Sequence, residues 1–118
     1  MIINIRKHII KTKKEYNEIL IIDFEKDFNF NNIQNEIFKL LEKNNYFIIN
    51  LNKVLLFNSN DFTLLLSILR IVNSNDGILK IVLNSEIKKI FTLSRLDRVF
   101  DIYDSEVAAL KEFEDEFE

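Results

Sequence analysis

Hydrophobic residues along this chain recur with two spacings, one typical of β-strands and one typical of α-helices. Strands are predicted where short runs of β-branched and aromatic residues are bounded by polar residues. Such runs cover residues 2–10, 18–24, 46–51, 78–83 and 102–103, and the third is predicted to extend over 54–57. We expect residues 11–17, between the first two strands, to form a hairpin loop.

Helices are predicted where apolar residues recur every three or four positions. The first follows Asn29 or Asn31, either of which can serve as its N-cap, and it ends at residues 44–45. The second covers 62–72, which is apolar on nearly all sides, so the protein itself or a partner must cover it. Two more helices are predicted to begin at N-caps Ser85 and Ser105.

The order of these elements predicts the fold class. After the opening hairpin, strands and helices alternate through short connections, which calls for an α/β layered fold with a mostly parallel sheet. We expect four to five strands, an N-terminal hairpin and about four helices packed against the sheet. The 118 residues fit a single domain over 1–118, with N-terminal strands in 1–28 and an acidic C-terminal tail at 110–118.

Composition argues against several classes of function. Cysteine is absent, His8 is the only histidine and Gly77 is the only glycine. These counts exclude disulfides, thiolate and multi-histidine metal sites, and glycine-rich phosphate loops. We therefore expect no enzymatic activity, no metal, no cofactor and no small-molecule substrate. Nucleic acid is not expected as a partner, because the basic residues near the N-terminus are few and the pI is about 5.3.

Two acidic groups and one aromatic pair could be read as ligand sites, but structural roles explain them better. The carboxylates at 97, 101 and 104 are too sparse for a hard cation, which needs a denser set of oxygen ligands. The alternating carboxylates at 23, 25 and 27 are typical of solvent-facing or cation-paired side chains. Phe100 and Tyr103 are predicted to pack in the core beside the last helix rather than stack on a ligand.

The hydrophobic runs also bear on the expected location of the protein. None approaches the roughly 18 residues that a membrane-spanning helix needs, and residues 1–4 do not resemble a signal sequence. We therefore expect a cytoplasmic protein without membrane insertion.

Residues 58–61, with the sequence Asn-Ser-Asn-Asp, separate an apolar run that ends at Phe57 from one that begins at Phe62. Asn50-Leu51 lies upstream, and the turn Asp76-Gly77 and the stretch IFTLSRLDRVFDIYDS at 90–105 lie downstream. In this order the pieces, which span about residues 46–110, resemble the STAS domain of anti-sigma-factor antagonists. The family pattern has Asp-Leu at the end of a strand, then Asp-Ser-Ser-Gly before an apolar helix, then a turn with glycine.

The resemblance implies a non-enzymatic switch. Family members of this type bind an anti-sigma serine kinase and so release the sigma factor that the kinase held. The kinase phosphorylates the first serine of Asp-Ser-Ser-Gly, which weakens the contact, and an opposing phosphatase resets it. Carried over to this chain, the phosphoacceptor is Ser59, and Asn58, Asn60, Asp61 and Phe62 are expected to contact the partner.

Three letters of the motif differ from the family pattern and keep other interpretations open. Asn58 replaces aspartate, Asn60 replaces serine and Asp61 replaces glycine, and Asp61 adds a carboxylate that could imitate a phosphate. On that hypothesis Asp61→Gly tightens kinase binding. Without the resemblance, Ser59 is an N-cap and its asparagine neighbours are turn residues. A non-phosphorylated scaffold, or a subunit of a signalling or lipid-transport complex, is the alternative function.

Overall fold

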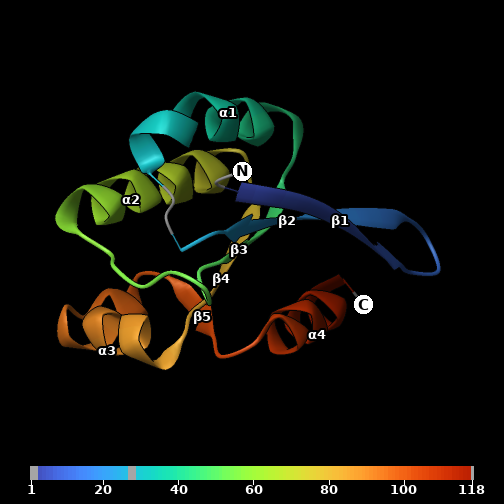
Figure 1. Cartoon of the computed structure of the whole chain (residues 1–118). Coiled ribbons are helices and arrows are strands. Elements are labelled where there is room, and N and C mark those ends of the chain that lie inside the picture. The colour runs from blue at the N-terminus through green and yellow to red at the C-terminus, as the bar shows by residue number, and fades with distance from the viewer. Residues whose placement is uncertain (1–2, 27–28, 118) are drawn as a thin grey trace.

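The computed structural model describes residues 3–26 and 29–117, and in this part of the chain five strands form one sheet. The strands lie in sequence order from one edge to the other (Figure 1). β1 runs antiparallel to β2, and every other neighbouring pair is parallel. Their bounds are β1 Ile3–Lys11, β2 Tyr16–Phe24, β3 Tyr46–Asn50, β4 Ile78–Val82 and β5 Asp101–Tyr103. The predicted mostly parallel sheet with an N-terminal hairpin is confirmed.

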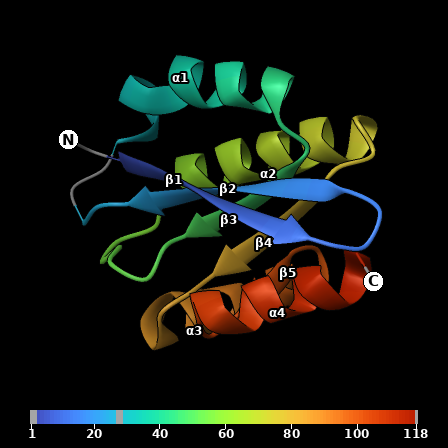
Figure 2. The ribbon, with the colours of Figure 1, turned by 90° about the vertical axis from the view of Figure 1, so that its right-hand side faces the viewer.

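Four α-helices occur within the described residues, on both sides of this sheet. α1 and α2 lie together above the sheet in Figure 2, and α4 lies below it. Their bounds are α1 Phe30–Lys43, α2 Ser59–Ser74, α3 Ser85–Leu93 and α4 Glu106–Phe117, and a short 3-10 turn, η1, covers Leu96–Arg98.

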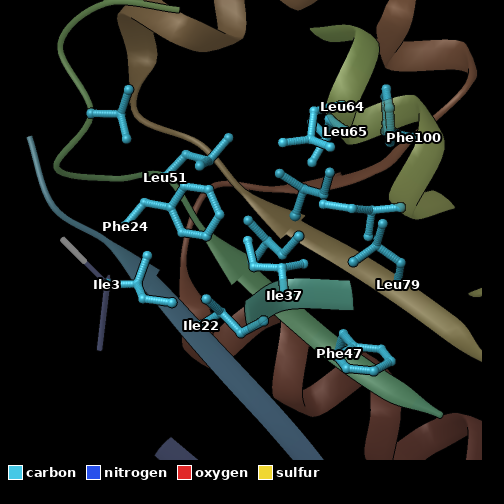
Figure 3. Close-up of a cluster of buried hydrophobic side chains, with 14 of the residues drawn as sticks. Ile3, Ile22, Phe24, Ile37, Phe47, Leu51, Leu64, Leu65, Leu79 and Phe100 are labelled. Atoms are coloured by element: carbon cyan, nitrogen blue, oxygen red, sulfur yellow. The ribbon is translucent and has the colours of Figure 1, made fainter. Parts of the chain in front are cut away.

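Alternation along the strands divides the apolar side chains between two cores. Ile22, Phe24, Phe47 and Leu79 point toward α1 and α2, where Ile37 meets them (Figure 3). The intervening strand residues point to the other side and pack under α4; they include Ile19, Ile21, Ile48 and Val82. Since both faces of β2 and β3 are covered, their sequences are continuous apolar runs and not alternating ones.

α2 is covered by the protein itself. Leu65 and Ile68 are fully buried, and the partly buried Leu66 and Leu69 also pack against the larger core, with α1 beside the helix. Of the two predicted possibilities, cover by the protein or by a partner, the structure shows that the protein itself covers most of the apolar surface of α2.

The predicted strand extension over 54–57 is wrong. Leu51 still donates its N–H to the Val82 carbonyl oxygen at 2.8 Å, but Val54 then donates to the Leu51 carbonyl oxygen at 3.0 Å. The chain therefore turns away from β4 after β3 and forms a loop. Within that loop Val54 and Phe57 are buried, whereas Leu55 and Leu56 are 70% and 84% exposed.

The predicted start of α3 is wrong by a single residue, and one of the two predicted caps of α1 fits the structure. Asn84, not Ser85, caps α3, because its Oδ1 accepts the N–H of Ile87 at 2.9 Å. α1 begins at Phe30, which places Asn29 and not Asn31 at the N-cap position. Ser105 is an N-cap as predicted, since its hydroxyl oxygen accepts the N–H of Ala108 at 3.1 Å.

Gly77 is required by close packing. Asp76, not Gly77, adopts the left-handed backbone at the end of α2, with φ of 57°. A β-carbon on Gly77 would collide with the carbonyl oxygen of Asn45, which accepts the N–H of Ile78 at 2.9 Å. The one glycine of the chain therefore lets the α2–β4 connection approach the start of β3.

The predicted acidic tail belongs to α4. The helix continues to Phe117, and the side chain of Phe113 within it is fully buried. Its ring lies edge-on to Tyr46, with 6.3 Å between centroids, and stacks on Phe117 at 5.7 Å. The glutamates between these aromatic residues are exposed, which gives the helix a polar outer face.

Candidate functional site

Ser59 is the first residue of α2 and follows β3 through the loop of residues 51–58. The residue is exposed, and its hydroxyl makes no hydrogen bond to any described residue. Its carbonyl oxygen accepts a hydrogen bond from the Thr63 hydroxyl at 3.0 Å. Backbone N–H groups of a first helical turn have no partner inside the helix, and the helix dipole favours negative charge there. The position therefore offers an accessible hydroxyl in surroundings that favour an anion.

Asn58, not Ser59, is the N-cap of α2, so the structural interpretation of Ser59 as a cap is wrong. The Asn58 Oδ1 accepts the N–H of Asp61 at 3.0 Å, and the Asp61 Oδ2 accepts the N–H of Asn58 at 2.9 Å. This reciprocal capping box starts the helix three residues earlier than predicted. Asn58 and Asp61 thus account for two of the three departures from the family motif, and they hold the first turn together.

Phe62, predicted to contact a partner, is partly buried in an aromatic cluster. Its ring lies edge-on to Phe57, with 4.6 Å between centroids, and 5.1 Å from the ring of Phe91. Phe91 belongs to α3, and it also lies 5.8 Å from Phe100. The cluster fixes the start of α2 against α3 and leaves only part of the Phe62 ring accessible.

Asn84 holds the loop before Ser59 in place. While its Oδ1 caps α3, its Nδ2 donates to the carbonyl oxygens of Asn52 at 3.0 Å and Val54 at 2.8 Å. One amide therefore connects the start of α3 to the loop that carries Leu55 and Leu56. The sequence does not predict this role of Asn84, because its only local signal is that an asparagine precedes Ser85, and either residue type can cap a helix.

A polar cleft of about 610 Å³ lies beside the first turn of α2. Predicted contact residues Asn58, Asn60 and Asp61 line one part of it, and Lys26, Asn29 and Gln34 line another. Asp61 is only 9% exposed, whereas Asn60 is exposed. Leu56 also borders this cleft. We call Leu55, Leu56, Ser59 and Asn60 the Ser59 surface: two exposed leucines beside an accessible hydroxyl and an amide.

An ion-pair group at another place connects β1, β2 and α4. The Arg6 Nε and Nη2 donate to the two carboxylate oxygens of Asp23 at 2.7 and 2.9 Å, and Nη1 donates to Glu106 at 3.1 Å. Arg6 holds the pKa of Glu106 below its usual value, against the opposing effect of burial. All three side chains are engaged with one another, so we assign the group a structural role.

Lys80 is a fully buried lysine on β4. Its Nζ donates to Asp101 at 2.7 Å, Tyr103 at 3.0 Å and Glu116 at 3.2 Å, and it lies 4.9 Å from the centre of the Phe113 ring. Burial by itself lowers the pKa of Lys80, but the three hydrogen bonds outweigh burial, so the pKa is raised. A lysine that stays charged here is a structural cation beneath α4.

Most of the acidic residues considered in the sequence are cation-paired where the structure describes them, whereas Asp97 is exposed and makes no ion pair with a described residue. Asp101 bonds Lys80, Asp104 bonds Lys88 at 2.7 Å, and Glu25 lies 3.7 Å from Lys53. Asp27 lies outside the described residues. Across residues 3–26 and 29–117 we find no group of three or more acidic, histidine or cysteine side chains that could hold a metal ion.

Both members of the aromatic pair pack inside the protein as predicted, but only Tyr103 lies beside the last helix, since Phe100 packs against Phe91 of α3. Phe100 is buried in the larger core, and Tyr103 is partly buried beneath α4 with its hydroxyl bonded to Lys80 and Asp101. In the described part of the chain, every helix is too short or too polar to cross a bilayer.

Comparison with known proteins identifies the fold. No family model matches the chain, and no curated protein matches it in sequence. A solved structure from Thermotoga maritima, described as an anti-sigma factor antagonist, is similar with a TM-score of 0.70 and 24% identity, over 92% of each chain. An anti-sigma factor antagonist from Mycobacterium paratuberculosis is similar with a TM-score of 0.66 and 16% identity, over 92% of this chain and 93% of that one.

The phosphorylated form of the Bacillus cell fate determinant SpoIIAA is similar at a lower level. Its TM-score is 0.57 and its identity 15%, over 92% of this chain and 99% of the Bacillus chain. At these identities the likeness establishes a common fold. The chain therefore has the α/β fold of the anti-sigma factor antagonists, as its resemblance to the STAS domain predicted.

Proposed function

We propose that this protein is a cytoplasmic anti-sigma-factor antagonist that binds an anti-sigma serine kinase and is phosphorylated on Ser59. The observation that carries the proposal is the place of Ser59: an exposed hydroxyl on the first turn of α2, directly after the β3 loop. The shared fold supports the general role, and one of the similar structures is a phosphorylated form.

The orientation of Asp61 makes a phosphate on Ser59 compatible with the altered motif. Each helical residue turns about 100° from the one before it, so side chains two positions apart point in nearly opposite directions. Asp61 is turned inward to the Asn58 N–H, whereas Ser59 is exposed. The phosphate would then extend away from the Asp61 carboxylate and toward solvent.

The transfer itself needs chemistry from the kinase. The Ser59 Oγ forms a bond to the γ-phosphorus of ATP, the bond to the β-phosphate oxygen breaks, and ADP leaves while the hydroxyl proton is lost. No described carboxylate bonds this hydroxyl, and the neighbouring Asn58 side chain is neutral and already bonded to Asp61. The base that accepts the proton is therefore expected to be a residue of the kinase.

The Ser59 surface explains how phosphorylation would weaken the contact. Leu55 and Leu56 offer apolar area, and Asn60 offers an amide for hydrogen bonding. A phosphate adds a charge of about −1.5 to −2 at pH 7 in the middle of that surface. Burying such a charge without a cation to pair with it opposes binding. A phosphatase that removes the group would restore the neutral surface.

A second candidate is a non-phosphorylated scaffold, or a subunit of a signalling or lipid-transport complex. The altered residues Asn58 and Asp61 favour it, because they stabilise this first turn themselves. Copurification separates the two: recovery of a kinase-like protein favours the antagonist, and recovery of transporter subunits favours the scaffold.

The proposed modification is tested by incubation with the cognate kinase and ATP, followed by mass spectrometry of the intact chain and its peptides. We expect one phosphate, on Ser59, and none on the Ser59→Ala variant. Thr63→Ala is the matched control, because Thr63 is an exposed hydroxyl one helical turn away. Phosphate on another residue, or on none, would contradict the proposed switch.

A further inference from the structure

The outer end of the β1–β2 hairpin has one face that no described helix covers. β2 pairs with β3 only over residues 20–23, so residues 16–19 and their β1 partners extend past the neighbouring strand (Figure 1). On the α4 side, Ile10 and Ile19 of this extension are buried. On the opposite side Ile9 and Tyr16 are 59% and 69% exposed.

The exposed face is basic as well as apolar. Strand alternation places Lys7, Ile9 and Lys11 on it from β1. The Lys11 ammonium lies 5.4 Å from the centre of the Tyr16 ring, and Lys7 lies 3.6 Å from Glu18. Lys13 and Lys14 follow at the exposed tip, so four lysines stand against Glu15 and Glu18 in a chain whose net charge is −3.

β1 also presents an open edge. It is the first strand in the sheet order, so its outer side pairs with no other strand among the described residues. It pairs with β2 over all nine of its residues, whereas the opposite edge strand, β5, has three. In an antiparallel pair alternate residues direct their N–H and C=O groups outward, which leaves a row of unpaired backbone groups along β1.

We propose that this edge of β1 binds an extended acidic segment of a partner protein as an added strand. Main-chain hydrogen bonds would supply affinity, and the side chains beside Lys7, Ile9 and Lys11 would supply selectivity. Because alternate residues of a strand share a face, the segment has the pattern acidic, any, apolar, any, acidic. The site is independent of Ser59, since the hairpin lies at the amino end of β2 and Ser59 follows the carboxyl end of the parallel β3.

Charge argues against a second copy of this chain as the occupant. Two β1 strands that pair antiparallel about Ile9 would place Lys7 of each copy opposite Lys11 of the other. Like charges directly opposite each other destabilise a strand pair. An acidic strand gives two attractive pairs at the same positions.

Charge also disfavours a flat anionic surface such as a membrane or a nucleic-acid duplex. Phe117, near the end of α4, and residues 11–15 of the hairpin line a common cavity, so the helix end adjoins the hairpin. Glu112, Glu114 and Asp115 on that helix are exposed. These carboxylates lie on the α4 side, behind the basic face, and they lower the positive potential around the hairpin tip, whereas an added strand meets Lys7 and Lys11 directly.

The test uses the peptide acetyl-Thr-Glu-Thr-Ile-Thr-Glu-Thr-amide, titrated into the isotope-labelled full chain and followed by NMR. We expect saturable shifts and slowed amide exchange confined to residues 7–11 of β1. The double variant Lys7→Glu, Lys11→Glu is expected to bind about tenfold more weakly, because two attractive pairs become repulsive. Its matched control is Lys53→Glu with Lys89→Glu, two exposed lysines outside the hairpin.

The outcomes decide the proposal. Retained shift dispersion in both double variants shows that they are folded. Equal peptide binding by both double variants, shifts on the helices, or no saturable change at millimolar peptide overturns it. The proposal is also overturned if a peptide with lysine in place of each glutamate binds more tightly than the glutamate peptide. Binding to phosphatidylserine vesicles that needs Lys7 and Lys11, without peptide binding, would assign the hairpin to membranes and also overturn it.

Discussion

Asp61 shapes the site as one half of the capping box at the start of α2. Its carboxylate accepts the N–H of Asn58 and is 9% exposed, so it stabilises the first turn of α2. The proposed imitation of a phosphate by Asp61 therefore cannot be tested by glycine, which removes the charge and the cap together. Asparagine removes the charge and keeps an oxygen that can accept the same hydrogen bond.

We predict that Asp61→Ala lowers the free energy of unfolding by about 1 kcal/mol, the usual cost of a lost helix cap, and that Asp61→Asn lowers it by less. Urea denaturation measures both. Tighter kinase binding by Asp61→Asn would support a phosphate-like effect of the charge. Equal losses of stability in the two variants would show that the capping hydrogen bond is not what Asp61 contributes.

A second residue-scale prediction concerns Lys80. Its partners Asp101 and Glu116 keep side-chain exposures of 51% and 37%, and Asp101 also accepts a hydrogen bond from Tyr103 at 2.9 Å. Removal of the lysine charge therefore leaves no carboxylate stranded in the core. We expect the free energy of unfolding of Lys80→Met, measured by urea denaturation, to lie within about 1 kcal/mol of the wild-type value. Lys80→Ala leaves a cavity, so its free energy of unfolding should be about 3 kcal/mol lower than that of the wild type in the same measurement.

At the scale of elements, the first turns of α2 and α3 are built alike. In each, asparagine stands before serine, and the asparagine is the cap. Both residue types are good N-caps, so the sequence could not decide between them. The apolar run at residues 54–57 has the length of a strand and so predicts one, but the structure has a loop there in which two of the four side chains are exposed. A local hydrogen bond between Val54 and Leu51 turns the chain there, and Asn84 holds the loop through contacts far apart in sequence that no local pattern contains.

We predict that Asn84→Asp separates the two roles of this residue. Aspartate can still cap α3 but cannot donate to the carbonyl oxygens of Asn52 and Val54. Asn84→Ala loses both contacts and about 2 kcal/mol of stability. Hydrogen exchange at 52–58 should accelerate in both variants, whereas Ser85→Ala should leave it unchanged. Unchanged exchange in Asn84→Asp would show that the loop does not depend on this amide.

The Arg6 group predicts a pH dependence of the contact between β1 and α4. Because Arg6 holds the pKa of Glu106 below its ordinary value of 4.5, this contact stabilises the fold above about pH 4.5 and is lost as the pH falls below it. Glu106→Gln should therefore be less stable than the wild type at pH 7, and the difference should shrink toward zero in acid. A difference that does not vary with pH, measured by thermal unfolding, would contradict the assignment.

At the scale of the whole molecule, the topology followed from the sequence because strands and helices alternate and each core strand is a short apolar run. The resemblance to the STAS domain suggested Ser59 as the phosphoacceptor, and the fold that the resemblance implied is shared with solved structures of anti-sigma factor antagonists. The ion pairs of Lys80 and Arg6 could not be predicted, because each joins residues far apart in sequence. The exposed face of the hairpin could not be predicted either, because it depends on how far α1 extends over the sheet.

The central claim is that a phosphate on Ser59 controls binding to an anti-sigma kinase. The most direct measurement is titration calorimetry of the purified cognate kinase with the unmodified chain and with the chain phosphorylated on Ser59. The account predicts that the unmodified chain binds and that the phosphorylated chain binds at least about tenfold more weakly, because the added charge lies within the contact. Equal affinity of the two forms, or no binding by the unmodified chain, would contradict it.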